Sequence, residues 1–188
     1  MVMNMGKIPK GFILILLILA GCSSGKDWRT ASRESAGIAP DPAVTHEAVL
    51  QVYAAKAWNW RGWFAVHTWI AAKRTGETFY TVYDVVGWRG YRGQPVLKIA
   101  RDLPDRHWFG AKPEILKTHR GAGVDALIDA VDEAARAYPW KTTYKALPGP
   151  NSNTFTAWIA KQVPRLELDL PWSAIGSGYA CTNVSGAS

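Results

Sequence analysis

Two short segments of this sequence carry side chains that could support nucleophilic chemistry. His67 lies in the apolar run FAVHTWIA, whose composition is typical of a β-strand. Ser152 lies in PGPNSNTF, a proline- and glycine-rich turn that opens directly into a helical pattern. Backbone N–H groups at a helix start favour a developing anion, and an imidazole on a neighbouring strand would be the natural base. We therefore predict acyl transfer or hydrolysis: Ser152 attacks a carbonyl, His67 takes and returns the proton, and amides near Ser152 and Asn153 hold the oxyanion.

The surrounding sequence predicts the elements that must position these residues. Runs of β-forming residues predict four strands, over 48–55, 63–71, 78–86 and 95–101. Apolar residues at helical spacing predict one helix over 124–138, which Pro139 stops, and another over 153–163, which Pro164 ends. The predicted fold class is therefore α+β, a small antiparallel sheet packed with two or three helices.

The N-terminus has the three-part pattern of an export signal. Two lysines precede an apolar run over residues 12–20, which is shorter than the roughly 20 residues that a membrane-spanning helix needs. Residues 19–22, LAGC, resemble the lipobox of bacterial lipoproteins. In that family the signal peptidase would cut between Gly21 and Cys22. We predict that acyl chains such as palmitate on the Cys22 thiol hold the protein on a membrane.

This pattern divides the chain into three parts. Residues 1–21 are the predicted lipoprotein signal peptide, 22–45 a flexible tether rich in Ser, Gly, Pro and charge, and 46–188 a single α+β domain. Ser23 after the lipidated cysteine favours the outer membrane, with the domain facing the periplasm. The tether would let the domain reach substrates near the membrane.

Composition limits the partners and cofactors. The formal net charge of +7 would fall to +5 on removal of the signal peptide with Lys7 and Lys10, and this surplus is compatible with anionic lipid or an anionic wall polymer. No basic run or nucleic-acid motif is present, so we expect no nucleic-acid partner. The four histidines lack the spacing of metal ligands, and no glycine-rich phosphate loop follows a strand, so we expect no metal and no cofactor. Cys181 would be the sole free thiol once Cys22 is acylated, and we expect a monomer.

Four runs between about residues 48 and 179 resemble a known family: FAVHTWIA, YTVYDVVGW, PGPNSNTFTAWIA and PWSAIG. They are similar to the bacterial lipoproteins of domain-of-unknown-function family 3750. More distantly, a His on an early strand and a later motif at a helix start resemble the circularly permuted papain-like (NlpC-type) peptidases and acyltransferases. In those relatives the His is the base, a Cys is the nucleophile, and a polar residue on the next strand orients the imidazole.

This resemblance implies roles for individual residues. His67 matches the base, Asp84 matches the orienting residue, and Ser152 stands where the distant relatives have cysteine. Asn151 and Asn153 flank the nucleophile and are candidate substrate-binding residues.

Each of these residues also has a structural interpretation. Ser152 could simply cap the helix, His67 could be a satisfied strand histidine, and Asp84 could pair with Arg89 or Arg92 or face water. The two asparagines could be turn formers, because Asn bonds readily to nearby backbone.

Ten tryptophans are an unusual number for a chain of 188 residues. Trp58, Trp60, Trp63 and Trp69 cluster around the turn before the His67 strand, where the rings could stack on sugars or lie at a lipid interface. Trp69 is a further candidate substrate contact. We expect most of the tryptophans to fill the core, with Trp58 and Trp60 the most exposed.

Two functions follow from these observations. The first is a lipid-anchored envelope enzyme, an amide or ester hydrolase or acyltransferase with a Ser–His site. The alternative is a catalytically inactive envelope module of the same fold that binds peptidoglycan, a peptide or a lipid.

Overall fold

The computed structural model describes residues 27–182, and the signal peptide and Cys22 predictions lie outside this range. Within this range, residues 31–182 belong to one compact unit, and residues 27–30 belong to a separate one. Residues 27–30 form a turn in which the Thr30 amide donates to the Asp27 carbonyl oxygen. None of the helices in the described part of the chain is both long and apolar enough to cross a membrane.

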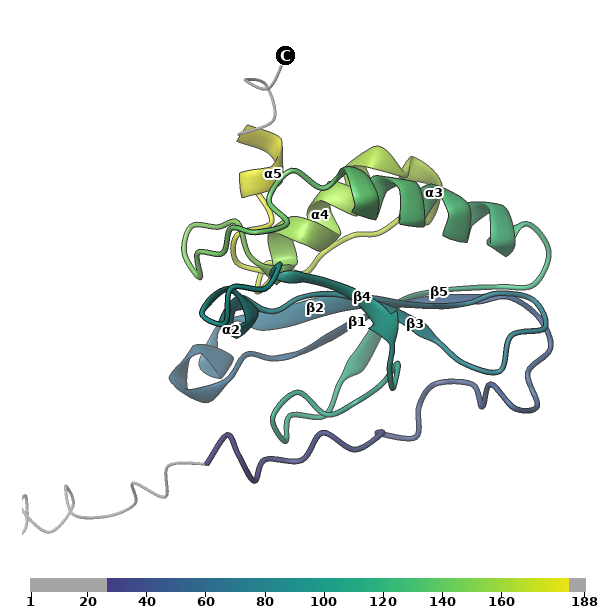
Figure 1. Ribbon diagram of the computed structural model, residues 1–188, viewed down its shortest axis with the longest axis horizontal. Coiled ribbons are helices and arrows are strands. Elements are labelled where there is room, and N and C mark those ends of the chain that lie inside the picture. The colour runs from purple at the N-terminus through teal and green to yellow at the C-terminus, as the bar shows by residue number, and fades with distance from the viewer. Residues whose placement is uncertain (1–26, 183–188) are drawn as a thin grey trace, which may run out of the picture. The chain divides into compact units, whose positions relative to one another are not determined.

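A five-stranded antiparallel sheet forms the centre of the domain (Figure 1). Its spatial order is β4-β3-β2-β1-β5, so β2 lies in the middle. The strands are β1 (Val49–Lys56), β2 (Val66–Lys73), β3 (Thr81–Val85), β4 (Leu97–Arg101) and β5 (Glu114–Arg120). The α+β class and four of the strands are therefore as predicted. The sequence did not predict β5, because this edge strand is largely exposed and has no apolar alternation.

Two helices pack on one face of the sheet (Figure 1). They are α3 (Val124–Ala137) and α4 (Ser152–Gln162), close to the predicted ranges. Their apolar stripes, with residues such as Val131 and Ile159, bury against Leu50, Val52 and Ile70 of the sheet. The short helices η2 (Pro164–Leu166) and α5 (Tyr179–Thr182) follow α4.

Irregular segments cover the opposite face of the sheet (Figure 1). Residues 31–45, which we predicted to be part of the tether, belong to the compact unit instead. The Asp105 carboxylate accepts hydrogen bonds from the Ser35 hydroxyl and from the backbone amides of Ile38 and Ala39, at 2.7 to 3.1 Å. The Tyr80 hydroxyl donates to the Pro40 carbonyl oxygen at 3.0 Å. The domain therefore begins at Ala31 rather than His46, because buried polar partners hold a segment that has no apolar periodicity of its own.

Two short helical turns lie at one end of the sheet. The 3-10 helix η1 (Asn59–Trp63) connects β1 to β2, and α2 (Gly87–Gly90) follows β3. The predicted strand over 63–71 therefore starts later, at Val66. The reason is that the chain before it turns tightly, with the Ala65 amide bonded to the Arg61 carbonyl oxygen at 2.8 Å.

Candidate active site

Ser152 is the first residue of α4, and a cap on the preceding residue fixes its position. The Asn151 side-chain oxygen accepts from the amides of Asn153 and Thr154, and the Thr154 hydroxyl accepts from the Asn151 amide. This reciprocal arrangement is a capping box. The helix is therefore capped by Asn151, and Ser152 is not needed as the cap. Among the described residues, the Ser152 hydroxyl has no hydrogen-bond partner, although the side chain is buried.

Two glycines lie against the start of α4, one in the turn before it and one in the loop after η2. Gly149 has a φ of 135°, and a Cβ there would lie 2.8 Å from the Thr154 hydroxyl oxygen. Gly176 has a φ of 93°, and a Cβ there would overlap the Asn151 side chain. Any side chain at these positions would displace the cap that presents Ser152.

The side chains of the two candidate substrate-binding asparagines form hydrogen bonds within the protein itself. The Asn151 side-chain amide donates to the carbonyl oxygens of Ala146 and Ile175. The Asn153 amide group donates to Val66 and Ile175, and its oxygen accepts from the Thr68 hydroxyl at 2.9 Å. These bonds attach the start of α4 to the start of β2, so both residues position the site from within the fold.

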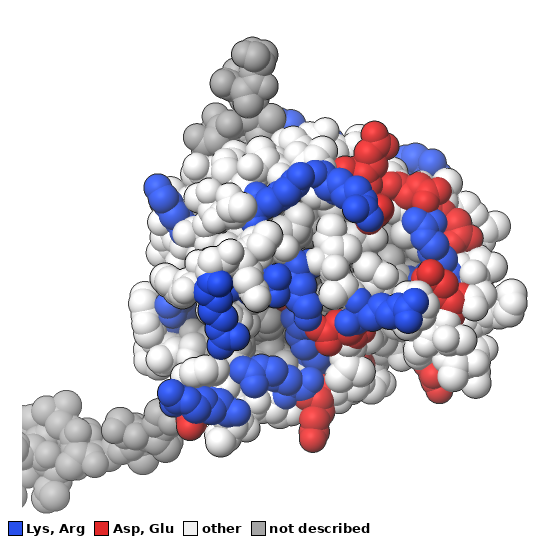
Figure 2. Space-filling model, in the orientation of Figure 1, with Lys and Arg blue, Asp and Glu red and all other residues white. Residues whose placement is uncertain are grey.

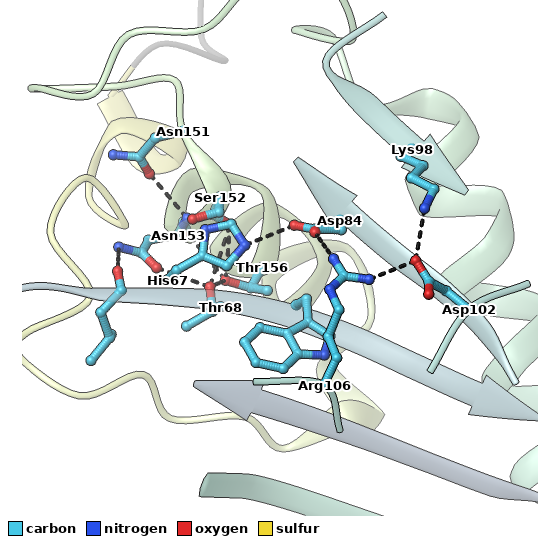
Figure 3. Close-up of polar contacts among 12 residues, drawn as sticks. His67, Thr68, Asp84, Lys98, Asp102, Arg106, Asn151, Ser152, Asn153 and Thr156 are labelled. Carbon is cyan, nitrogen blue, oxygen red and sulfur yellow. Dashed lines mark hydrogen bonds and ion pairs between the residues drawn. The ribbon is translucent and has the colours of Figure 1, made fainter. Parts of the chain in front are cut away.

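His67 and Asp84 form a buried pair on the face of the sheet opposite the helices. The His67 Nε2 atom lies 2.9 Å from the Asp84 Oδ1 atom (Figure 3). Backbone pairing between β2 and β3 covers only Ile70 to Ala72 on β2, so at His67 the two strands have already separated. The side chains bridge the strands where the backbone ladder has ended.

Arg106 holds the other oxygen of the Asp84 carboxylate. Its Nη2 atom donates to Asp84 Oδ2 at 2.6 Å, and its Nη1 atom donates to the Asp102 carboxylate at 2.7 Å (Figure 3). The Asp102 carboxylate also accepts a hydrogen bond from Lys98 at 2.7 Å. Burial alone would raise the pKa of the Asp84 carboxyl, but His67 and then Arg106 outweigh it and hold this pKa below its usual value. The partner of Asp84 is therefore Arg106, not Arg89, Arg92 or water.

An ionised Asp84 fixes the tautomer of His67. A carboxylate only accepts hydrogen bonds, so Nε2 must carry the proton and donate it. In the neutral imidazole the Nδ1 atom then holds the lone pair, and this atom has no hydrogen-bond partner among residues 27–182. Because the other side of the ring is anchored, Nδ1 is available to act as a base.

Trp108 fixes the plane of the imidazole. Its ring stacks on His67 with a centroid separation of 3.5 Å and an interplanar angle of 7°. Trp69, which we expected to contact the substrate, is fully buried, and its indole N–H donates to the Pro104 carbonyl oxygen at 2.7 Å. Trp69 does not line the cavity described below, because its strand position directs it into the core beneath Trp108.

A cavity of about 630 Å³ contains both His67 and Ser152 in its lining. Seven of its lining residues are aromatic, with Trp58, Trp60, Trp88, Trp108 and Tyr144 among them. Among the described residues, no hydrogen bond joins the Ser152 hydroxyl to His67. Catalytic hydrogen bonds are often long in a site without substrate and shorten when it binds, so the shared cavity is the relevant observation.

Sequence reasoning missed two contributors to this site. Arg106 and Trp108 lie in the loop between β4 and β5, in the run DRHWFG, which has neither strand nor helix periodicity. Their roles depend on where that loop folds back onto the sheet, which no local pattern predicts. No group of three or more His, Cys, Asp or Glu side chains within residues 27–182 could hold a metal ion.

Fold and site together define an α+β protein in which one cavity is lined by a helix-start serine and by the histidine of a buried His–Asp pair. The chain belongs to the DUF3750 family, described as proteins of unknown function, and the match covers residues 47–179. The matched range contains His67, Asp84, Arg106 and Ser152. Comparisons with curated proteins and with solved structures give no match.

Proposed function

We propose that this protein is a cell-envelope hydrolase or acyltransferase that uses Ser152 as nucleophile, His67 as base and Asp84 as the residue that orients the imidazole. One observation carries the proposal: an unbonded hydroxyl at a helix start and an unbonded Nδ1 of an anchored imidazole line the same cavity. In this proposal the site resembles that of the permuted papain-like peptidases, with serine in the position of the cysteine.

The proposed reaction proceeds in two steps. In the first, the Ser152 oxygen bonds to the substrate carbonyl carbon while its proton passes to His67 Nδ1. The C–N or C–O bond then breaks, and the leaving group takes that proton. In the second step, water or an acceptor alcohol or amine attacks the acyl-serine, and the proton returns through His67 to Ser152.

The backbone amide of Ser152 is the available oxyanion donor. It has no hydrogen-bond partner among the described residues, and it lies at the positive end of an 11-residue helix. The Asn153 amide, which we expected to share this role, already donates to the Asn151 side chain at 3.0 Å. We therefore assign the oxyanion contact to Ser152 alone.

The N-terminal motif supports the envelope location. We propose that Cys22 is acylated after cleavage at Gly21 and that the domain faces the periplasm from the outer membrane. Cys22→Ala should abolish labelling with a palmitate analogue and release or stall the precursor. Unchanged labelling and attachment would disprove the anchor.

A serine-directed fluorophosphonate probe tests the chemistry. We expect wild type to be labelled, Ser152→Ala not to be labelled, and His67→Ala to be labelled about 10²–10⁴-fold more slowly. Ser173→Ala is the matched control, because Ser173 lies near the start of β2 but does not line the cavity. Equal labelling of wild type and Ser152→Ala would contradict the proposal.

The missing hydrogen bond between Ser152 and His67 favours a second function, an inactive module that only binds an envelope ligand. It predicts that correctly folded wild-type protein is not labelled at any pH. That result would contradict the proposed enzyme and favour the binding module.

A further inference from the structure

Exposed apolar side chains gather around the mouth of the cavity. Three of the ten tryptophans are buried and five are exposed, contrary to the expectation that most fill the core. Trp58, expected among the most exposed, is only half-exposed. We define the aromatic rim as six exposed residues from η1, α2, the residues that directly follow these two helices, and the loop before α4: Trp60, Trp63, Phe64, Trp88, Tyr91 and Leu147.

The rim residues project outward rather than into the cavity floor. The exposed fraction is 90% for Trp63 and 94% for Tyr91, which is unusual for large aromatic residues in the absence of a partner. Five of the six also line the cavity, and Trp63 lies in the same 3-10 helix as Trp60. Three separate chain segments therefore present apolar tips around one opening.

The charges at this opening are all positive. Arg61 and Lys145 line the cavity, and no Asp or Glu occurs among the described residues that do so. The Arg61 guanidinium lies 5.6 Å from the centroid of the Trp60 ring, so cation and aromatic ring form one unit. On the face shown in Figure 2, acidic side chains gather mainly toward the right, around α3.

We infer that the aromatic rim docks on the surface of an anionic phospholipid bilayer. Tryptophan and tyrosine beside arginine and lysine are the side chains that settle at the headgroup level, where the rings enter the interface and the cations meet phosphate. A glycan chain would require rings that line a groove and stack along it. Trp63 and Tyr91 instead project from the rim.

Docking in this orientation would open the cavity toward lipid headgroups. Where the proposed function holds, the acyl group that Ser152 attacks belongs to a lipid, which enters the cavity directly from the interface. The docking surface itself does not depend on that chemistry. Ser152→Ala should therefore keep the docking and lose only the labelling.

Fluorescence quenching by brominated phospholipids tests the docking. Full-length protein is reconstituted into vesicles of phosphatidylglycerol and chain-brominated phosphatidylcholine, so that any N-terminal attachment is the same in every variant. We expect strong quenching of tryptophan fluorescence in wild type. In Trp63→Ser with Tyr91→Ser the quenched fraction should fall by about half, because the remaining rim tryptophans lift from the interface.

Three controls make the result decisive. Val44→Ser and Ile115→Ser remove exposed apolar residues outside the rim and should leave quenching unchanged. Arg61→Gln should reduce quenching in anionic vesicles and leave it unchanged in purely phosphatidylcholine vesicles. Unfolding temperatures equal to wild type will show that the variants are folded, as expected for side chains this exposed.

Two outcomes would overturn the inference. The first is equal quenching of wild type and the Trp63→Ser, Tyr91→Ser variant. The second is weak quenching of wild type combined with cosedimentation with peptidoglycan sacculi that is lost when the rim residues are changed. That combination would show that the rim binds a glycan. Fluorophosphonate labelling of the same samples shows independently whether the Ser152 chemistry stands.

Discussion

The two faces of the sheet are built differently, and each supplies one half of the candidate site. The helix face is a packed apolar layer, in which α3 and α4 bury aliphatic and aromatic side chains. The loop face holds stacked aromatic rings and an ionic network of Asp84, Arg106 and Asp102 under irregular chain. The serine comes with the helix face and the His–Asp pair with the loop face. The site therefore lies where β2 and β3 separate, because only there can the two halves share a cavity.

The largest effect is expected from breaking the ionic network of the loop face. Asp84→Ala should lower the free energy of unfolding by about 3–5 kcal/mol at neutral pH, because it removes a fully buried carboxylate that pairs with both His67 and Arg106 and leaves Arg106, only 11% exposed, with Asp102 alone. Denaturant titration measures this. The double variant Asp84→Leu, Arg106→Leu should recover most of the lost stability. If the double variant is as unstable as Asp84→Ala, the charge pair is not the cause.

The same pair makes stability depend on pH. The pKa of Asp84 is depressed in the folded protein, whereas an unfolded Asp titrates near about 3.9. Its contribution is therefore complete above that pH and is lost as the pH falls through the lower, folded value. The stability difference between wild type and Asp84→Asn should shrink at acid pH. Parallel stability curves down to acid pH would contradict the depressed pKa.

Damage to the helix face should unfold the whole domain. Ile159→Ala removes a fully buried side chain of α4 and should cost about 2–5 kcal/mol. Because this core holds both helices on the sheet, circular dichroism and fluorescence should report one coincident transition. Separate transitions for the two probes would show that the helix layer unfolds on its own.

Damage at the edge of the loop face should act locally. Asp105→Ala removes the acceptor for the Ser35 hydroxyl and the Ile38 and Ala39 amides, at a cost of about 1–3 kcal/mol. Hydrogen exchange at Ile38 and Ala39 should speed up, while the amides of β1 stay protected. Faster exchange throughout β1 would mean that residues 31–45 are part of the cooperative core.

The smallest effects distinguish two neighbouring residues at the start of α4. Asn151→Ala should cost about 1–2 kcal/mol, because it removes the helix cap. Ser152→Ala should change stability by less than about 0.5 kcal/mol, because its hydroxyl bonds to nothing in the described structure. Thermal unfolding of the two variants measures the difference. A similar loss in both would make Ser152 a structural residue.

The sequence predicted the regular half of this molecule well. The periodicity of residues 124–138 and 153–163 predicted α3 and α4, since an amphipathic helix on a sheet has a repeating apolar stripe. The placement of His67 on a strand and of Ser152 at a helix start was also predicted, because strong local patterns define both positions. The role of Asp84 depended on family resemblance, and the structure places it against His67.

The irregular half could not be predicted in the same way. Arg106, Trp108 and residues 31–45 act through single long-range contacts, such as the bond between Arg106 and Asp84. Such contacts produce no periodic pattern in the sequence. The exposed tryptophans were misassigned for a related reason: composition favours burial of large rings, whereas a docking surface exposes them.

The strand order also sets when the site can exist during synthesis and folding. His67 and Asp84 are 17 residues apart on neighbouring strands of a meander, so the base and its carboxylate can meet early. The residues of α4 that contact β2 lie 85 positions further along the chain. A chain interrupted before α4 would hold the base without the nucleophile. Under the proposed function, reactivity would appear only after α4 has docked on the sheet, so the chemistry would require a nearly complete domain.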